Sequence, residues 1–477
     1  MKKYIRYICF LVFISLVVIA LNFGSFNVGL CAILLLFVNN IIYSLENLKE
    51  RVVFCVFNCM IFVFIISRPT IQMFKGEKWW EVYTQEQVVF ALTSVGISLL
   101  FLFIGGKIGE IISKQENKSK KINGKYRKGF LKNLSTISLI LFYISFGFNL
   151  IVGLEKVIYM IGREYTEYYV SFQSHLPYVI YICSTFMTYA LCIYLGGKPT
   201  KKEALIPLGL YFISAIPDLI IGMRNPIMLH ALFIVIYFYM RNDTDKKEIW
   251  LGKIEGIILS IGMVFVLPLM GIYRYLISGV TYIKYSVFSG LVDFFYGQGV
   301  TFDVLQIGYA CIPNLPDREF RNYTFGGFID YFLHGTIAQK FFGAIPLGNG
   351  NNLNNALLSN RFAHNMSYID KGEKYLNGEG WGSSYLLEVF TDYGYIGIII
   401  FSLILGSLMV LYLKIMRKNS LTAAIVLIVL TQLFFMPRSG ATECFEFLLQ
   451  IQFWVTIIIC YLGAGLCTKK YEIDVVN

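Results

Sequence analysis

The sequence reads RYLISGVTYIKYSVFSGLVDFFYGQGVTFDVLQ at 274–306, LGNGNNLNNALLSNRFAHN at 347–365 and KYLNGEGWGSS at 374–384. These pieces belong to the interval 274–384, the only long hydrophilic interval between hydrophobic segments. The segments before and after it are apolar enough to cross a bilayer. We therefore predict that membrane spans hold this interval on one face of the membrane, and that its substrate is reached from that face.

The composition indicates an integral membrane protein. Of the 477 residues, 56% are hydrophobic and only 15% are charged, and the mean hydropathy is +0.62. Soluble domains average about 25% charged residues. The ten cysteines form no metal or disulfide pattern, because most lie inside apolar runs where a free thiol behaves as a small hydrophobe. The net charge of +11 could indicate nucleic-acid binding, but membrane topology accounts for it, and we expect no nucleic-acid partner.

The apolar runs predict about twelve transmembrane helices. The N-terminal run has the basic start of a signal peptide, but it is long and no A-x-A cleavage site follows, so we interpret it as a retained span. The short run from Pro226 is acceptable as a span, because proline fits the first position of a helix. The predicted spans are 5–23, 26–44, 52–67, 87–106, 133–154, 177–196, 204–223, 226–240, 254–273, 387–413, 420–436 and 444–466.

Lysine and arginine predict the orientation. If the N-terminus is cytoplasmic, the inner segments hold more than half of the 41 basic residues, as the positive-inside rule requires. Both termini are then cytoplasmic, and 274–384 lies outside. We divide the chain into an N-terminal transmembrane bundle (1–273), an extracytoplasmic loop (274–384) and a C-terminal transmembrane segment (385–477).

Two segments of the loop have the spacing of short amphipathic helices that lie at the membrane surface. Bulky apolar residues recur at helical intervals in the first segment, and roughly so in the second. These residues are Tyr285, Phe288, Leu291, Val292 and Phe295 in the first, and Phe328, Phe332, Phe341 and Phe342 in the second. We expect a partly ordered lid over the outer ends of the bundle.

Three arginines are predicted near the outer ends of the spans. Arg224 lies in the hairpin GMRNP, Arg274 in GIYRYL and Arg438 in FMPRSGATE. Guanidinium groups form paired hydrogen bonds with phosphate oxygens, so arginines that converge at headgroup depth suit a lipid-linked pyrophosphate. Each arginine could instead reach into the headgroups or pair with a carboxylate. We find no charged residue at mid-membrane, which disfavours a transporter with coupling carboxylates there.

Three side chains are candidates for acid–base chemistry: Glu388, His364 and Asp303. A base must lie within hydrogen-bond reach of the sugar hydroxyl that it activates, and a half-buried carboxylate has its pKa raised toward neutrality. The structural alternatives are an ion pair for Glu388, a surface position for His364 and a turn cap for Asp303. Asp303 is also a candidate for substrate binding.

Further substrate contacts are predicted for Trp381, by stacking on a sugar ring, and for the carboxylates Asp392 and Glu443 at outer helix ends. Tyr375 and the asparagines of 349–355 could bind carbohydrate, although a flexible polar loop explains them equally well. The sequence has no Walker lysine loop, no dinucleotide fingerprint and no H-E-x-x-H motif, and its four histidines are scattered. We therefore expect no cofactor and no metal ion.

The span layout and two motifs resemble the bacterial repeat-unit polymerases of O-antigen and capsular polysaccharide, the Wzy type. The motifs are GMRNPIMLHALFIVIYFYM at 222–240 and GWGSSYLLEVFTDYGYIG at 380–397. The second resembles the family's G-x-S-x-x-x-E followed by D-x-G-x-x-G, which leads into the next span. The resemblance implies that Arg224, and more weakly Arg274 and Arg438, engage the lipid pyrophosphate, and that Glu388 is the motif's glutamate. His364 and the next asparagine resemble the H-N of related O-antigen ligases, but the spacing to the following span is longer here.

The resemblance implies an all-α polytopic membrane enzyme similar to metal-independent polymerases of the GT-C type. It would join polyprenyl-pyrophosphate-linked oligosaccharide repeat units at the outer face of the bacterial cytoplasmic membrane. Membrane lipid, a flippase and a chain-length regulator are the implied partners. Two alternatives stay open at this point: a ligase that transfers finished glycan to another acceptor, and a lipid-oligosaccharide flippase, which should have a charged central cavity and shorter outer loops.

Overall fold

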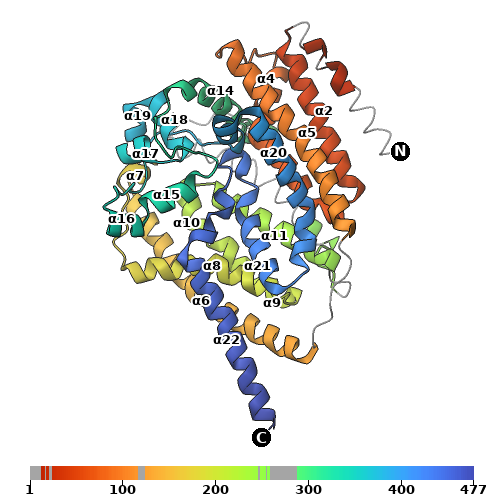
Figure 1. Ribbon diagram of the computed structural model, residues 1–477, viewed down its shortest axis with the longest axis vertical. Coiled ribbons are helices and arrows are strands. Elements are labelled where there is room, and N and C mark those ends of the chain that lie inside the picture. Colours follow the sequence, from red (N-terminus) through yellow and green to blue (C-terminus); the bar gives the residue numbers. More distant parts are fainter. Residues whose placement is uncertain are drawn as a thin grey trace. The chain divides into compact units, whose positions relative to one another are not determined.

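The computed structural model describes residues 12–16, 18–20, 24–115, 124–244, 248–253, 255–257 and 287–476. Every regular element in these ranges is a helix (Figure 1). The described residues form two compact units. Unit 1 is built from Met1–Ile111, Leu251–Leu411 and Phe434–Glu443, and unit 2 from Ile112–Trp250, Tyr412–Leu433 and Cys444–Asn477.

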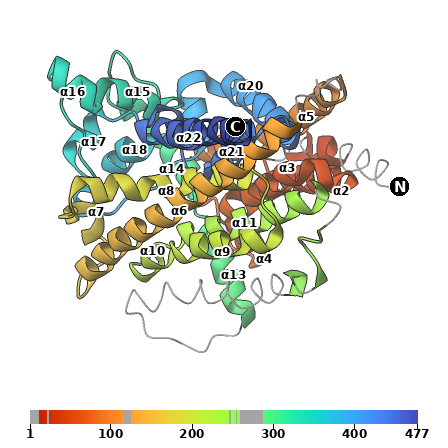
Figure 2. The same ribbon diagram turned by 90° about the horizontal axis from the view of Figure 1, so that it is seen from below.

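Unit 1 combines membrane-length helices with the short helices of the loop. Its helices before the loop are α2 (Phe26–Glu46), α3 (Leu48–Ile61), the π-helical turn η1 (Phe62–Ile66), α4 (Ser67–Phe74) and most of α5 (Gln85–Gln115). The loop contributes α13 (Val287–Gln298), α14 (Thr301–Cys311), η2 (Ile312–Asn314), α15 (Gly326–His334), α16 (Thr336–Phe342), α17 (Leu353–Leu358), α18 (Phe362–Lys371) and α19 (Glu373–Leu376). Most of α20 (Tyr385–Met416) and the turn η3 (Met436–Arg438) complete the unit. Figure 2 shows α15 to α18 gathered together.

Unit 2 is a bundle of long helices around an apolar core. Its elements are α6 (Gly124–Met160), α7 (Glu167–Ser171), α8 (Tyr178–Gly196), α9 (Lys201–Ile213), α10 (Ile216–Ile220), α11 (Asn225–Thr244), α21 (Ser420–Leu433), most of η4 (Glu443–Leu449) and α22 (Ile451–Val476). The fully buried side chains at its centre come from α6, α8, α21 and α22, which therefore pack together. They are Leu134, Ile193, Ala424, Cys460 and Ala464.

Nine stretches within the described residues are long and apolar enough to cross a membrane, which confirms an all-α polytopic membrane protein. They are Phe26–Glu46, Leu48–Phe74, Gln85–Lys114, Lys128–Met160, Tyr178–Gly196, Lys201–Ile220, Tyr385–Met416, Ser420–Arg438 and Ile451–Thr468. Each overlaps one of the twelve predicted spans. The last begins later than predicted, because 443–449 is a separate 3-10 helix.

The other three predicted spans have different outcomes. The region 226–240 is helical and lies within α11. Polar Asn225, His230 and Arg241 lower the mean hydropathy of α11, and this helix is not among the nine. Most of 5–23 and 254–273 lies outside the described residues. The count of twelve therefore stays a prediction.

Helices α5 and α20 pack backbone against backbone. A methyl group on Gly406 would lie 2.3 Å from the Leu102 carbonyl oxygen, and one on Gly105 would lie 2.2 Å from that of Leu403. The Ser407 hydroxyl donates to the Gly105 carbonyl at 2.8 Å. Small residues that permit such an approach are the usual means of joining helices in lipid, where apolar surface alone gives little attraction.

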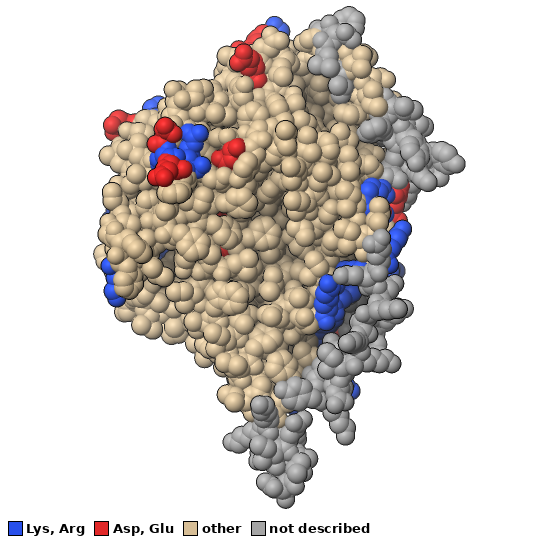
Figure 3. All heavy atoms as spheres, viewed as in Figure 1, with Lys and Arg blue, Asp and Glu red and all other residues tan. Residues whose placement is uncertain are grey.

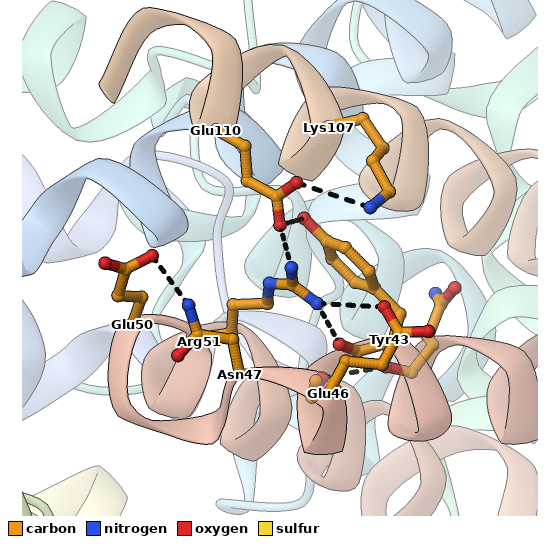
Figure 4. A network of polar contacts seen from close by, with 9 residues as sticks. Tyr43, Glu46, Asn47, Glu50, Arg51, Lys107 and Glu110 are labelled. Atoms are coloured by element: carbon orange, nitrogen blue, oxygen red, sulfur yellow. Dashed lines mark hydrogen bonds and ion pairs between the residues drawn. The ribbon is translucent and has the colours of Figure 1, made fainter. Parts of the chain in front are cut away.

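A polar network joins α2, α3 and α5 at one end (Figure 4). Arg51 is 7% exposed, and its guanidinium pairs with Glu110 and lies 3.9 Å from the centre of the Tyr43 ring. The Tyr43 hydroxyl donates to Glu110 at 2.8 Å, and Lys107 pairs with the same carboxylate at 3.3 Å. A buried guanidinium needs such partners, because an uncompensated charge away from water is costly. The network therefore holds the three helix ends in register.

The motif DYGYIG at 392–397 divides α20 into two pieces. Gly394 has φ +62° and ψ −159°, a conformation that needs glycine, so the helix breaks there. Glycine at 397 leaves room for the Tyr393 side chain on the other side of the break, because a methyl group on Gly397 would lie 2.5 Å from the Tyr393 Cβ. The first piece, 385–393, carries Glu388 and Asp392.

The loop helices are held by buried polar contacts as well as by apolar packing. Asp330 of α15 is 8% exposed and accepts hydrogen bonds from the Ser359 hydroxyl and from the Asn360 amide groups at 2.7–3.0 Å. The first predicted amphipathic segment forms α13, and Tyr285 lies outside the described residues. Helix α13 packs against α4 and η1, so that only Phe288 of its predicted apolar residues is strongly exposed.

We expect Gly406→Ala to destabilise the protein by about 1–3 kcal/mol, because the added methyl group meets a helix backbone that has no room to move. The thermal unfolding of purified protein in detergent measures this loss. Gly147→Ala is the matched control, since a methyl group there meets nothing within 4 Å. Equal unfolding temperatures for the two variants would contradict the close packing of α5 on α20.

Candidate functional site

The candidate site in unit 1 is centred on Glu388, in the first turn of α20. The Ser384 oxygens accept the backbone N–H groups of 386–388 and so begin the helix. A carboxylate in a first turn also interacts favourably with the helix dipole. Glu388 is 4% exposed, and its oxygens are held separately: Oε1 accepts from the Ser383 hydroxyl at 2.8 Å, and Oε2 accepts from the Ala441 N–H at 2.7 Å.

The turn 438–443 runs directly past this carboxylate. A methyl group on Gly440 would lie 3.1 Å from Glu388 Oε2 and 3.1 Å from Glu443 Oε1, so glycine lets the chain pass between two carboxylates. On the other side of the turn, a methyl group on Gly382 would lie 3.4 Å from the Arg438 carbonyl oxygen. The segments 382–384 and 438–443 therefore meet around Glu388.

Glu443 is held by an arginine of the loop. Its Oε1 lies 3.1 Å from Nη1 of Arg361, which begins α18, and both side chains are more than one-third exposed. An ion pair so exposed contributes little to stability. The ion pair instead fixes the positions of the two side chains. It places an accessible guanidinium and a second, accessible carboxylate next to the turn that passes the buried Glu388.

His364, one turn into α18, contacts Tyr375. Its Nδ1 lies 2.8 Å from the Tyr375 hydroxyl. Burial and then the positive charge of Arg361 lower the pKa of His364 to about 4. The imidazole is therefore neutral at pH 7 and is a weak base there.

Arg438 and Arg68 flank the turn between α13 and α14. Arg438 Nη1 donates to the backbone and side-chain oxygens of Gln298, both at 3.1 Å. The next residue, Gly299, packs on α4 so closely that a methyl group there would lie 2.6 Å from the Arg68 backbone nitrogen. Arg68 Nε lies 2.9 Å from Asp303 Oδ2. Consecutive residues of this turn thus hold the guanidinium of Arg438, through Gln298, and pack on the backbone of Arg68, through Gly299.

Asp303 lies in the first turn of α14 and has two partners, the Arg68 guanidinium and the Tyr83 hydroxyl. Burial raises the pKa of Asp303, although the Arg68 charge and a hydrogen bond from Tyr83 both oppose the increase. Arg68 also lies over the Tyr296 ring, 4.4 Å from its centre. The π-helical turn η1 ends just before this arginine, and such turns are frequent at functional sites.

Two predicted substrate contacts have partners within the protein. Asp392 accepts the N–H groups of Tyr323 and Thr324 and the Thr324 hydroxyl, at 2.6–3.2 Å, so it anchors this part of the loop. The Trp381 ring donates from Nε1 to Asp370 at 2.6 Å. One face of this ring is covered by Lys371, whose Nζ lies 4.5 Å from the ring centre, so this face is not available for stacking.

The other two predicted arginines are Arg224 and Arg274. Arg224 belongs to unit 2, where it is half-buried in the turn between α10 and α11, as the hairpin GMRNP predicts. Gly222 permits this turn with φ +99°. The nearby Asp218 pairs with Lys156 at 3.0 Å. Arg274 lies outside the described residues. The predicted convergence of three arginines therefore stays a prediction.

Sequence reasoning missed Arg68, Arg361 and Ser383. Ser383 lies inside the quoted motif GWGSS and could have been chosen from it. Arg68 follows directly on the predicted span 52–67, and this position at a span end was the available signal. Arg361 has no such signal, because its partner Glu443 is 82 residues away. Within the described part of the chain, no three His, Cys, Asp or Glu side chains are grouped to hold a metal ion.

Polar groups thus gather at the ends of three spans. Arg68 is near the end of Leu48–Phe74, Glu388 is near the start of Tyr385–Met416, and Arg438 ends Ser420–Arg438. The fold and this site define a polytopic membrane protein with a carboxylate and arginine cluster at its span ends. The chain belongs to the family described as O-antigen polysaccharide polymerase Wzy, whose model matches residues 4–471. It polymerises repeat units into O-antigen, and the ligase and flippase alternatives are not favoured. No curated protein and no solved structure matches the chain.

The lowered pKa of His364 predicts a pH dependence of stability. The unfolded chain takes up a proton near pH 6.5, whereas the folded chain resists it down to about 4. The contribution of His364 is therefore fully present above pH 6.5 and is lost as the pH falls from 6.5 toward 4. We expect His364→Gln to reduce the drop in unfolding temperature between neutral and acidic buffer. His175→Gln, at an exposed histidine, is the control, and an undiminished drop in His364→Gln would contradict the assignment.

Proposed function

We propose that the substrates are oligosaccharide repeat units linked to polyprenyl pyrophosphate. A hydroxyl at the non-reducing end of a newly arrived unit attacks the anomeric carbon of the growing glycan. The bond between that carbon and the pyrophosphate oxygen breaks, polyprenyl pyrophosphate leaves, and the hydroxyl proton passes to a protein base. The reaction takes place at the outer face of the bacterial cytoplasmic membrane, with both termini of the chain cytoplasmic. A flippase that supplies the units and a regulator of chain length are the partners in this scheme.

Glu388 is the base in this scheme, and the arrangement of its two oxygens carries the proposal. Each oxygen accepts one hydrogen bond from the protein, whereas a carboxylate has about four acceptor positions. A fixed carboxylate with remaining acceptor capacity suits removal of a proton from a sugar hydroxyl. Glycine at 440 lets the turn pass close to Oε2, where a methyl group would be crowded at 3.1 Å, and so brings the Ala441 N–H to this oxygen.

Arg438 and Arg68 are assigned to the leaving pyrophosphate. Both are held near one turn of unit 1, and the backbone of Arg438 adjoins the segment that carries Ser383. Charge develops on the pyrophosphate oxygens as the bond breaks, and positioned guanidinium groups stabilise it without rearrangement. This assignment requires no metal ion. Arg224 and Arg274 are further candidates for the same task. Glu443, with its partner Arg361, and Trp381 are assigned to binding the acceptor sugar.

We expect Glu388→Gln to lower the rate of polymerisation by about 100-fold or more, because the amide fills the same space but does not accept the proton. Purified protein is incubated with a lipid-linked repeat unit in buffer containing EDTA, and the glycan ladder is followed over time. Wild-type ladders in EDTA support the metal-independent scheme.

The matched control is Glu379→Gln, a carboxylate of the same loop that pairs with Lys371 and is 47% exposed. It should leave the ladder unchanged. Full activity in Glu388→Gln, with its unfolding temperature also unchanged, would remove Glu388 from the mechanism.

The arginine assignment predicts graded losses. Arg438→Gln and Arg68→Gln should each lower the maximal rate by about 10²–10³-fold, as loss of one stabilising donor does. The corresponding lysine variants should recover part of the rate, because they keep the charge but not the paired geometry. Arg163→Gln, at an exposed arginine, serves as the control. If lysine and glutamine variants are equally active, the charge of these residues has no role in the reaction.

A further inference from the structure

Six bulky apolar side chains are exposed on α15, on α16 and directly beside these two helices, and they are here called the outer apolar face. Phe341 and Phe342 of α16 are 71% and 83% exposed, although both are phenylalanines in an ordered helix. Side chains of this size are the most costly to leave in water. The members of the face are Phe325, Phe332, Ile337, Phe341, Phe342 and Ile345, each between 47% and 83% exposed.

The protein holds these side chains outward by contacts on the opposite side of the same helices. Asp330 fastens the inner side of α15 to Ser359, and Ala338 is the buried residue of α16. The two helices are also tied to the segment that follows, since His334 Nδ1 lies 2.8 Å from the Ile345 carbonyl oxygen. The face is therefore fixed by the fold and is not available to pack into unit 1 by a simple rotation.

The charges of the loop lie on other helices. The segment from Phe325 to Ile345 contains one acid, Asp330, which is buried, and one lysine, Lys340. By contrast, α18, α19 and the residues that follow carry a group of charged side chains, and Figure 3 shows acids and bases gathered over α18 and α19. These are Asp370, Lys371, Glu373, Lys374 and Glu379. The loop thus has one polar side and one apolar side.

The outer apolar face continues onto a membrane-spanning helix. Asn322 joins the two, because its Oδ1 accepts the Phe325 N–H at 2.9 Å and its Nδ2 donates to the Tyr393 hydroxyl at 2.8 Å. Tyr393 is 49% exposed and lies directly before the break at Gly394. After the break, an apolar stripe runs along α20 at four-residue intervals through Ile396, Ile400 and Ile404, which are 70%, 53% and 56% exposed. Exposed isoleucines on a membrane span face lipid, so the lipid-facing surface leads directly to Phe325.

We propose that the outer apolar face is a membrane-docking surface, inserted among the lipid headgroups and upper acyl chains on the side of the bilayer that the loop faces. Its phenylalanines supply the apolar contact, and Lys340 is placed to meet lipid phosphate, as in helices that lie in the membrane interface. Docking fixes the height of the loop above the bilayer. The inference depends on membrane insertion of the chain and not on the proposed chemistry of Glu388.

Photo-crosslinking in lipid nanodiscs tests the proposal with the full chain. A diazirine amino acid replaces Phe341 in one variant and Phe332 in a second, and the control variant carries it at Asn377, an exposed position on the polar side of the loop. After irradiation, mass spectrometry measures the fraction of each site that carries a phospholipid adduct. We expect several-fold more lipid adduct at Phe341 and Phe332 than at Asn377.

Every other pattern of adducts overturns the proposal. Lipid adduct at Phe341 and Phe332 no higher than at Asn377 would show that lipid does not contact the face in preference to the polar side. Crosslinks from Phe341 to a second copy, to another protein or to another part of the chain would show that protein covers the face. Phe332 and Phe341 lie on different helices. If one replacement disturbs folding of its own helix, the variant with the other replacement still tests the face.

Discussion

Direct backbone contact between α5 and α20 is the constraint on which unit 1 depends. Gly105 and Gly406 are the points of closest approach, and no side chain larger than hydrogen fits at either. Because this contact fixes α20 along its length, it also fixes where the helix begins. Gly394 then redirects the first two turns, so that Glu388 and Asp392 project toward the loop instead of continuing along the span.

Three acids of unit 1 join helices to the loop, and they differ in acceptor capacity. Asp330 accepts hydrogen bonds from three donor groups, and one of these, the Asn360 N–H, is shared between both of its oxygens. Asp392 accepts three, all from Tyr323 and Thr324. Glu388 accepts two, one on each oxygen. The same kind of contact thus makes a structural anchor of Asp330, while Glu388 keeps the capacity to accept a proton from a ligand.

The sequence predicts the fold further than it predicts the site. Long apolar runs are local signals, so the spans overlapping α2 and α20 are found within three residues, whereas α5 continues nine residues past its predicted end. The motif at 380–397 singles out Glu388 from the residues alone. Arg361 is not found in this way, because only folding brings it to Glu443. Trp381 is a third case. The residue is visible in the sequence, but Lys371 and Asp370 limit what it can bind, and these contacts depend on how α18 packs.

The asparagine-rich run shows why polarity in a loop does not by itself indicate a ligand. Asn351 donates to the carbonyl oxygens of Tyr375 and Glu379, and Asn355 donates to that of Gly350 at 2.8 Å. Asn352 accepts the Asn355 N–H and so caps α17. A loop of short helices leaves many backbone groups without helical partners, and buried groups of this kind must be satisfied. The amides satisfy them, which makes this part of the loop an ordered support. We therefore propose that recognition of the sugar depends instead on side chains at its edge, such as Arg361 and Trp381.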